Sequence, residues 1–166
     1  MEVIDYNGDG RWSCQEVIAR YRLAMQRRKL DPRDLSPGES TENGRRRVYP
    51  VMHEVIKGIE AGDPGCIEIG LEFIEEDAKF PFGKTLKSNT ARALRRADLS
   101  EPQKRRVRRR VFGLLGAGHI PHEYREYAKL LRKVGFAATD IPAIDSRDRY
   151  VIRFHDYFER NARPGS

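Results

Sequence analysis

Residues 100–118 read SEPQKRRVRRRVFGLLGAG, and this stretch decides which fold we expect. Ser100 is a favourable N-cap residue, and Gly116 and Gly118 are typical of the end of a helix. Four apolar residues recur at helical spacing in between, at Val107, Val111, Leu114 and Leu115. Most of the remaining helical circumference is filled by five arginines: Arg105, Arg106, Arg108, Arg109 and Arg110. The stretch therefore predicts a helix with one buried apolar stripe and a broad cationic face.

Positive charge is concentrated around this predicted helix. The range 84–110 holds eleven Lys and Arg residues against Asp98 and Glu101, a net charge of +9. The whole chain of 166 residues carries +7, so the remainder sums to −2. A local excess of this kind favours an anionic partner, because it is not balanced by acids close in sequence.

We predict that this cationic surface binds nucleic acid or another polyanion through its phosphates. The predicted contact residues are Lys84, Lys87, Arg92, Arg95, Arg96, Arg105, Arg108 and Arg109. The range 84–110 contains no aromatic residue, although proteins that bind single strands use aromatic side chains as stacking platforms. The alternative is that the arginines form ion pairs with an acidic stripe at Glu68, Glu72, Glu75 and Glu76, which can neutralise only part of them.

The rest of the chain is also predicted to be helical. Apolar residues recur at helical spacing over 51–59, 66–80, 84–99, 121–134 and 146–158, and no run of strand length alternates between apolar and polar residues. The connections between these segments are short, which favours antiparallel neighbours. We therefore expect an all-α fold whose helical hairpins pack as a bundle or as a short HEAT-like stack.

The chain divides by composition into four ranges. Residues 1–30 are predicted to form a loop and a helix, a helical arm. The range 31–46 (DPRDLSPGESTENGRR) contains two prolines, two glycines and almost no apolar residue, so it is predicted to be a flexible linker. Residues 47–160 form the helical domain, and residues 161–166 are predicted to be a disordered tail.

Residues 5–16 read DYNGDGRWSCQE and match the pattern D-x-[DN]-x-[DN]-G-x5-E. This stretch resembles an EF-hand loop. The resemblance implies calcium as a cofactor, held by the side chains of Asp5, Asn7, Asp9, Ser13 and Glu16 and by the backbone carbonyl of Arg11. An alternative needs no metal: Asn7 and Gly8 would form a turn, and Ser13 with Glu16 would form a capping box at the start of the next helix.

Other features narrow the functional class. No apolar run is long enough to span a membrane, and Cys14 and Cys66 lie far apart, so we expect a cytoplasmic protein without a membrane partner. No nucleophile or general-base motif is recognisable, so we assign no catalytic residue and favour a binding module over an enzyme. The alternative function is a protein-interaction scaffold whose N-terminal loop binds calcium. In that case a protein partner or a second copy would contact the N-terminal arm.

Overall fold

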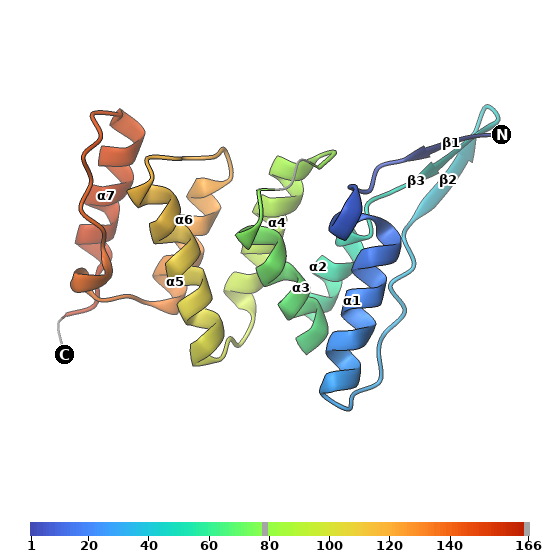
Figure 1. The fold of residues 1–166 in the computed structure, drawn as a ribbon, viewed down its shortest axis with the longest axis horizontal. Coiled ribbons are helices and arrows are strands. Elements are labelled where there is room, and N and C mark those ends of the chain that lie inside the picture. Colours follow the sequence, from blue (N-terminus) through green and yellow to red (C-terminus); the bar gives the residue numbers. More distant parts are fainter. Residues whose placement is uncertain (78–79, 165–166) are drawn as a thin grey trace.

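The computed structural model describes residues 1–77 and 80–164, and these residues are mostly helical (Figure 1). The helices are α1 (Cys14–Arg27), α2 (Met52–Glu60), α3 (Pro64–Glu75), α4 (Gly83–Arg96), α5 (Glu101–Gly116), α6 (Tyr124–Val134) and α7 (Arg149–Asn161). Two single 3-10 turns cover Gly10–Trp12 and Ala138–Asp140. The strands are β1 (Glu2–Asp5), β2 (Glu39–Glu42) and β3 (Arg45–Val48).

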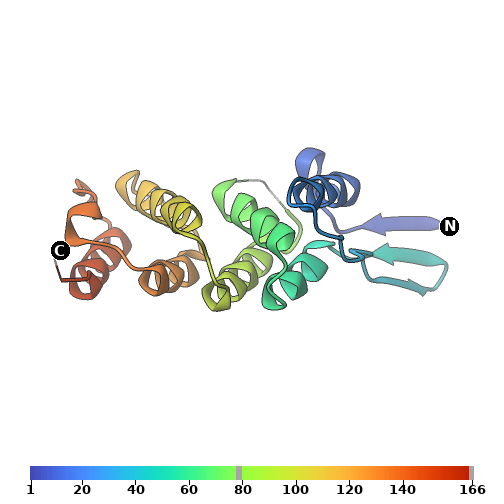
Figure 2. The same ribbon diagram turned by 90° about the horizontal axis from the view of Figure 1, so that it is seen from below.

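The helices lie in two layers that run along the molecule (Figure 2). Helices α1, α3 and α5 are side by side in one layer, and α2, α4 and α6 are side by side in the other. Helix α7 packs against both α5 and α6 at the C-terminal end, and the sheet lies at the N-terminal end. A single apolar core runs between the layers, from Trp12 to Phe158.

The predicted helix at the centre of the sequence is confirmed as α5. Ser100 caps it: its hydroxyl accepts a hydrogen bond from the Gln103 N–H, and the Gln103 side chain accepts one from the Ser100 N–H. The four apolar residues of the predicted stripe are buried in the core. The capping residues and the apolar spacing of this stretch thus predicted the helix correctly.

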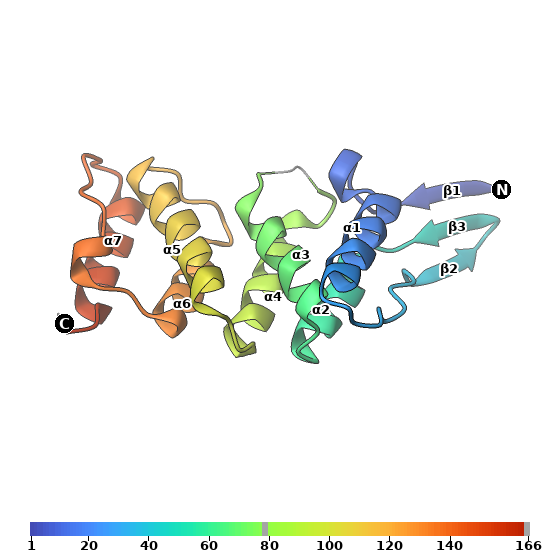
Figure 3. The same cartoon turned by 60° about the horizontal axis from the view of Figure 1, so that its bottom comes forward.

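The expectation of an all-α fold is corrected by a small sheet with the strand order β1-β3-β2 (Figure 3). Strand β1 pairs with β3 in parallel, and β2 pairs with β3 in antiparallel orientation. Apolar alternation could not reveal these strands, because they are short and highly charged. Their pairing is accompanied by ion pairs between neighbouring strands: Arg45 with Glu2, Arg46 with Glu39, and Arg47 with Glu42.

The range 31–46, predicted to be a flexible linker, contains β2 and the start of β3. Asn43 and Gly44 connect the two strands with φ values of 51° and 71°, as a two-residue hairpin turn requires. Leu35, in the same range, is buried in the core. The Asn-Gly pair was therefore the one local signal for this hairpin in the sequence.

The predicted N-terminal arm is part of the helical body. Val17, Tyr21 and Met25 of α1 are buried, and α1 packs against α3. The Tyr21 hydroxyl donates to the Asp63 carboxylate at 2.7 Å and accepts from the Arg33 N–H at 2.9 Å. These contacts tie α1 to the body, so it does not project as a separate arm.

Part of the predicted C-terminal tail contacts the rest of the protein. The Arg163 N–H donates to the Phe136 carbonyl at 2.9 Å, while residues 165–166 of the predicted tail lie outside the described residues. Cys14 and Cys66 are both free thiols. Among the described residues, no helix combines the length and the apolar character that crossing a membrane requires.

Candidate nucleic-acid interface

Several arginines of α5 form contacts inside the molecule. The Arg106 guanidinium pairs with the Glu68 carboxylate at 2.9 Å and with the Glu75 carboxylate at 2.5 Å. The hydrogen bonds that Arg106 donates to Glu75 and Glu68 raise its pKa above the ordinary value, so this arginine remains charged. Arg110 donates to the Ile74 carbonyl at 2.9 Å. The acidic stripe on α3 thus neutralises part of α5, as the alternative interpretation expected.

Two of the eight predicted contact residues also donate to backbone carbonyl groups of this chain. Lys87 is buried, and its ammonium group donates to the Glu76 carbonyl at the end of α3. Burial lowers the pKa of Lys87. Arg108 donates to the Gly135 carbonyl at 2.7 Å and pairs with Glu101 at 2.8 Å. These two cations hold neighbouring segments together.

The other six predicted contact residues are at least partly accessible to solvent. Lys84, Arg92, Arg96, Arg105 and Arg109 are exposed, and Arg95 is half-buried. They belong to α4 and α5, which lie in different layers (Figure 2). Of these six residues, Arg95 alone lines a groove in which seven cations gather.

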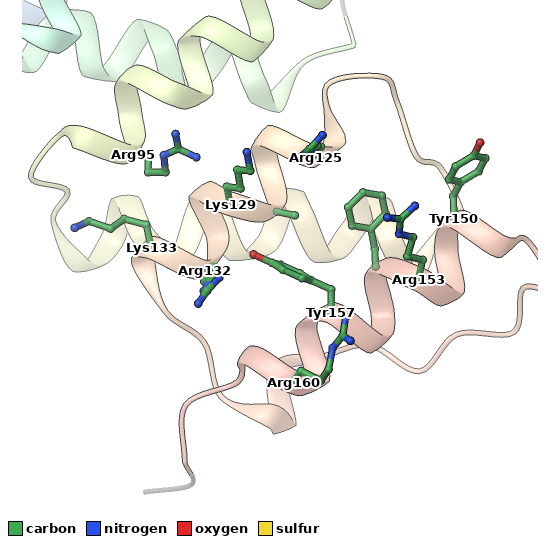
Figure 4. Close-up of a pocket in the computed structure, with 11 residues that line it drawn as sticks. Arg95, Arg125, Lys129, Arg132, Lys133, Tyr150, Arg153, Tyr157 and Arg160 are labelled. Atoms are coloured by element: carbon green, nitrogen blue, oxygen red, sulfur yellow. The ribbon is translucent and has the colours of Figure 1, made fainter.

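That groove lies between α4, α6 and α7, and its volume is about 960 Å³ (Figure 4). Seven of its eleven lining residues are cationic and none is acidic. The seven are Arg95 from α4, Arg125, Lys129, Arg132 and Lys133 from α6, and Arg153 and Arg160 from α7. We call these residues the groove cations. Apart from Arg95, none of them is among the contact residues predicted from the sequence.

Helix α6 places its groove cations on one face by simple helical spacing. Arg125, Lys129 and Arg132 recur at i, i+4 and i+7, while Tyr127 and Leu131 are buried on the side toward the core. The contrast between the two faces makes α6 strongly amphipathic. The spacing of these cations can be read from the sequence. Only the packing of α4 and α7 beside α6 shows that they line a groove.

Helix α7 forms the opposite wall of the groove. Arg153 and Arg160 are seven residues apart and therefore lie two turns apart on the same face. Val151 and Phe158 are buried on the other face and fix the rotation of the helix. Two tyrosines and Phe154 also line this wall, and Figure 4 shows the Tyr157 side chain reaching from α7 toward α6.

One buried acid lies beneath the groove. The Glu126 side chain is 10 % exposed, and its carboxylate lies 3.4 Å from the Arg92 guanidinium, 3.6 Å from that of Arg95 and 3.7 Å from the Lys129 ammonium group. Glu126 therefore orients two of the groove cations. Within the part of the chain that the structure describes, the other five form no ion pair: Arg125, Arg132, Lys133, Arg153 and Arg160.

Two of the predicted calcium ligands, Asn7 and Arg11, already accept hydrogen bonds within the protein. The Asn7 side-chain oxygen accepts from the Val51 N–H at 2.7 Å, and its amide group donates to the Asp5 carboxylate at 2.8 Å. The Arg11 carbonyl accepts from the Arg20 guanidinium at 2.5 Å. Metal coordination by Asn7 and Arg11 would have to displace or share these contacts.

The last residues of the predicted calcium loop form the N-terminal end of α1. The Ser13 hydroxyl accepts from the Glu16 N–H at 3.2 Å and thereby caps the helix. Asp9 and Glu16 are exposed. The Ser13 hydroxyl supplies one half of the predicted capping box, and calcium binding stays a prediction.

A different group has the composition of a metal site among the described residues. His155, Asp156 and Glu159 of α7 can bring their ligand atoms within 4.8 Å of one another, and His155 lies 3.9 Å from Glu159. Asp156 and Glu159 are exposed, so this group is an ordinary surface arrangement on one helix.

No protein-family model, curated protein or solved structure matches this chain. The functional argument therefore rests on the geometry and charge of the site.

Proposed function

We propose that the protein binds nucleic acid through the groove between α4, α6 and α7. The observation that carries this proposal is the set of seven groove cations in a lining without an acid. Cations gathered in one groove repel one another and attract anions. A nucleic-acid backbone offers closely spaced phosphates, and binding to it releases condensed counterions.

The ion pairs within the chain favour the groove, rather than the surface of α5, as the binding site. Arg106, Arg108 and Arg110 of α5 form ion pairs with acids of this chain. Most of the groove cations form none within the described residues. Charged side chains that are already paired have less to gain from a phosphate, whereas guanidinium groups without a partner can bind phosphate oxygens in a bidentate manner.

The arrangement of the helices also suits an extended ligand. Hairpins stacked side by side in a HEAT-like manner present equivalent helices along one surface, and such surfaces bind long partners. Here α4, α6 and α7 contribute cations from three successive parts of the stack. A polymer lying along them would contact several cations at once.

Matched triple variants test the proposal. One variant carries Arg125→Gln, Arg153→Gln and Arg160→Gln in the groove. The control carries Arg22→Gln, Arg105→Gln and Arg109→Gln, which change the net charge equally at exposed positions on α1 and α5. Affinity is measured by fluorescence anisotropy with a labelled oligonucleotide. We expect the groove variant to lose at least about tenfold in affinity and the control to lose less than about threefold.

Circular dichroism should show that both variants remain folded, since all six arginines are exposed. An equal loss of affinity in the two variants would show that binding follows net charge alone. No binding by the wild-type protein would refute the proposed function.

A further inference from the structure

Aromatic and cationic side chains alternate along the groove face of α7. Tyr150, Arg153, Tyr157 and Arg160 follow one another at i, i+3, i+7 and i+10, so they share one face of the helix. All four line the groove (Figure 4). The face therefore offers flat rings and charged groups in turn to whatever occupies the groove.

Tyr150 is exposed, and Tyr157 packs only in part against the apolar core. Tyr150 is 48 % exposed. The guanidinium of the neighbouring Arg149 lies over its ring, 4.9 Å from the ring centre, and donates to its hydroxyl at 2.9 Å. Tyr157 is half-buried and meets the Phe158 ring edge-on, with the ring centres 5.6 Å apart. Both tyrosines thus keep solvent-accessible surface and line the groove.

The spacing of the rings favours an extended strand. Tyr150 and Tyr157 are seven positions apart on the helix, so the distance between them along its axis is about 10 Å. Bases in a duplex are stacked about 3.4 Å apart, and their faces are covered by their neighbours. Only an unpaired strand can turn separate bases toward two rings while its phosphates reach the cations between them.

We infer that the groove binds single-stranded nucleic acid, with bases stacking on Tyr150 and Tyr157 and phosphates held by the groove cations. This inference rests on the proposed function and specifies its ligand. The range 84–110 contains no aromatic residue, and the structure supplies the missing rings from α7. A base stacked on a ring adds affinity that depends little on sequence, because each base has a flat face.

The test compares ligands and variants by fluorescence anisotropy. The ligands are oligothymidine and oligouridine of about 20 nucleotides and a mixed-sequence duplex of the same length. The variants are Tyr150→Ala and Tyr157→Leu, the second of which keeps an apolar contact for Phe158. Tyr150→Phe retains the ring. Phe82→Leu removes an exposed aromatic side chain that precedes α4, at the end opposite to Arg95.

We expect single strands to bind more tightly than the duplex. Tyr150→Ala and Tyr157→Leu should each weaken single-strand binding by about fivefold or more and change duplex binding by less than about twofold. Phe82→Leu should leave both affinities unchanged. Tyr150→Phe should weaken single-strand binding less than Tyr150→Ala does, because it keeps the ring. The salt dependence should be the same in all four variants, because no cation is removed. A difference between oligothymidine and oligouridine tells whether DNA or RNA is preferred.

The outcomes separate the two proposals. Duplex binding that equals or exceeds single-strand binding, together with unchanged affinities in the tyrosine variants, would overturn this inference and leave the proposed function intact. Absence of binding to all three ligands would overturn both.

Discussion

The Arg95 guanidinium of α4 lies 3.6 Å from the Glu126 carboxylate of α6. A residue of the hairpin α5–α6 therefore orients a groove cation of the preceding hairpin, α3–α4. Glu126 also approaches Arg92 and Lys129. The same carboxylate thus connects two helices and fixes two groove cations at the place where α4 and α6 meet. Stability and the positioning of the binding surface are linked at this residue.

Replacing Glu126 separates these two roles. Glu126→Gln removes the charge shared by three cations, which are themselves partly exposed. We therefore expect the free energy of unfolding to fall by about 1–2 kcal/mol in urea denaturation. Affinity for nucleic acid should not fall, because a negative charge beneath the groove is removed. A loss of affinity at unchanged stability would instead show that Glu126 acts mainly by positioning Arg95.

Arg106 is predicted to be structural. Arg106→Gln leaves Glu68 and Glu75 beside each other without their shared partner, and we expect a loss of about 2 kcal/mol in the free energy of unfolding. Arg105→Gln, one residue away and exposed, should change it by less than about 0.5 kcal/mol. Urea denaturation of the two variants measures the difference. Equal stabilities would mean that the α3–α5 ion pairs contribute nothing.

Stability should decrease at alkaline pH. Burial raises the pKa of the Cys66 thiol to about 12 and raises the pKa of the Tyr124 and Tyr127 hydroxyls. In the unfolded chain these groups lose protons near pH 8.5 and 10, about their ordinary values. The unfolded state then binds fewer protons than the native state, so the free energy of unfolding falls as pH rises. This stability is fully present below about pH 8.5.

A pH series of urea denaturation curves measures the effect. The midpoint should be constant from about pH 7 to 8 and decline above about pH 9. Burial raises the pKa of the Cys14 thiol as well, so the double variant Cys14→Ala, Cys66→Ala should move the onset toward about pH 10, where the tyrosines dominate. A midpoint that stays constant up to about pH 11 would contradict the account.

Calcium binding by residues 5–16 is open to a direct titration. Trp12 is buried and donates to the Glu76 carboxylate at 2.6 Å, so a rearranged loop should change its fluorescence. Because Asn7 already accepts from Val51, we expect any binding to be weak, in the range of about 1 mM. Asp9→Ala and Glu16→Gln should abolish the response. Unchanged Trp12 emission at about 10 mM calcium would show that the loop is only a turn and a helix cap.

The strongest local signals in the sequence were sufficient to predict α5. Its capping residues, its apolar stripe and its terminal glycine all favour the same boundaries, and the structure has a helix from Glu101 to Gly116. The hairpin of β2 and β3 was missed because its strands are held by charged residues such as Arg46 and Glu39. Apolar periodicity carries no information about strands of this kind.

The groove could be predicted only in pieces. The spacing of Arg125, Lys129 and Arg132 on α6 was readable in the sequence. Arg95 and Arg160 are 65 residues apart, and only the packing of the helices brings them to one groove. The sequence also could not show which arginines are paired inside the protein. The sequence does not distinguish Arg106 from Arg153, yet the first holds α5 to α3 and the second lines the groove.

The salt dependence of binding tests the central claim most directly. Five groove cations without an ion pair among the described residues should give a slope of about −3.5 for log affinity of a single strand against log salt concentration. The groove variant with Arg125→Gln, Arg153→Gln and Arg160→Gln removes three of them, so its slope should be shallower by about 2, while the control variant keeps the wild-type slope. The same slope for the groove variant and the wild type would contradict binding through the groove.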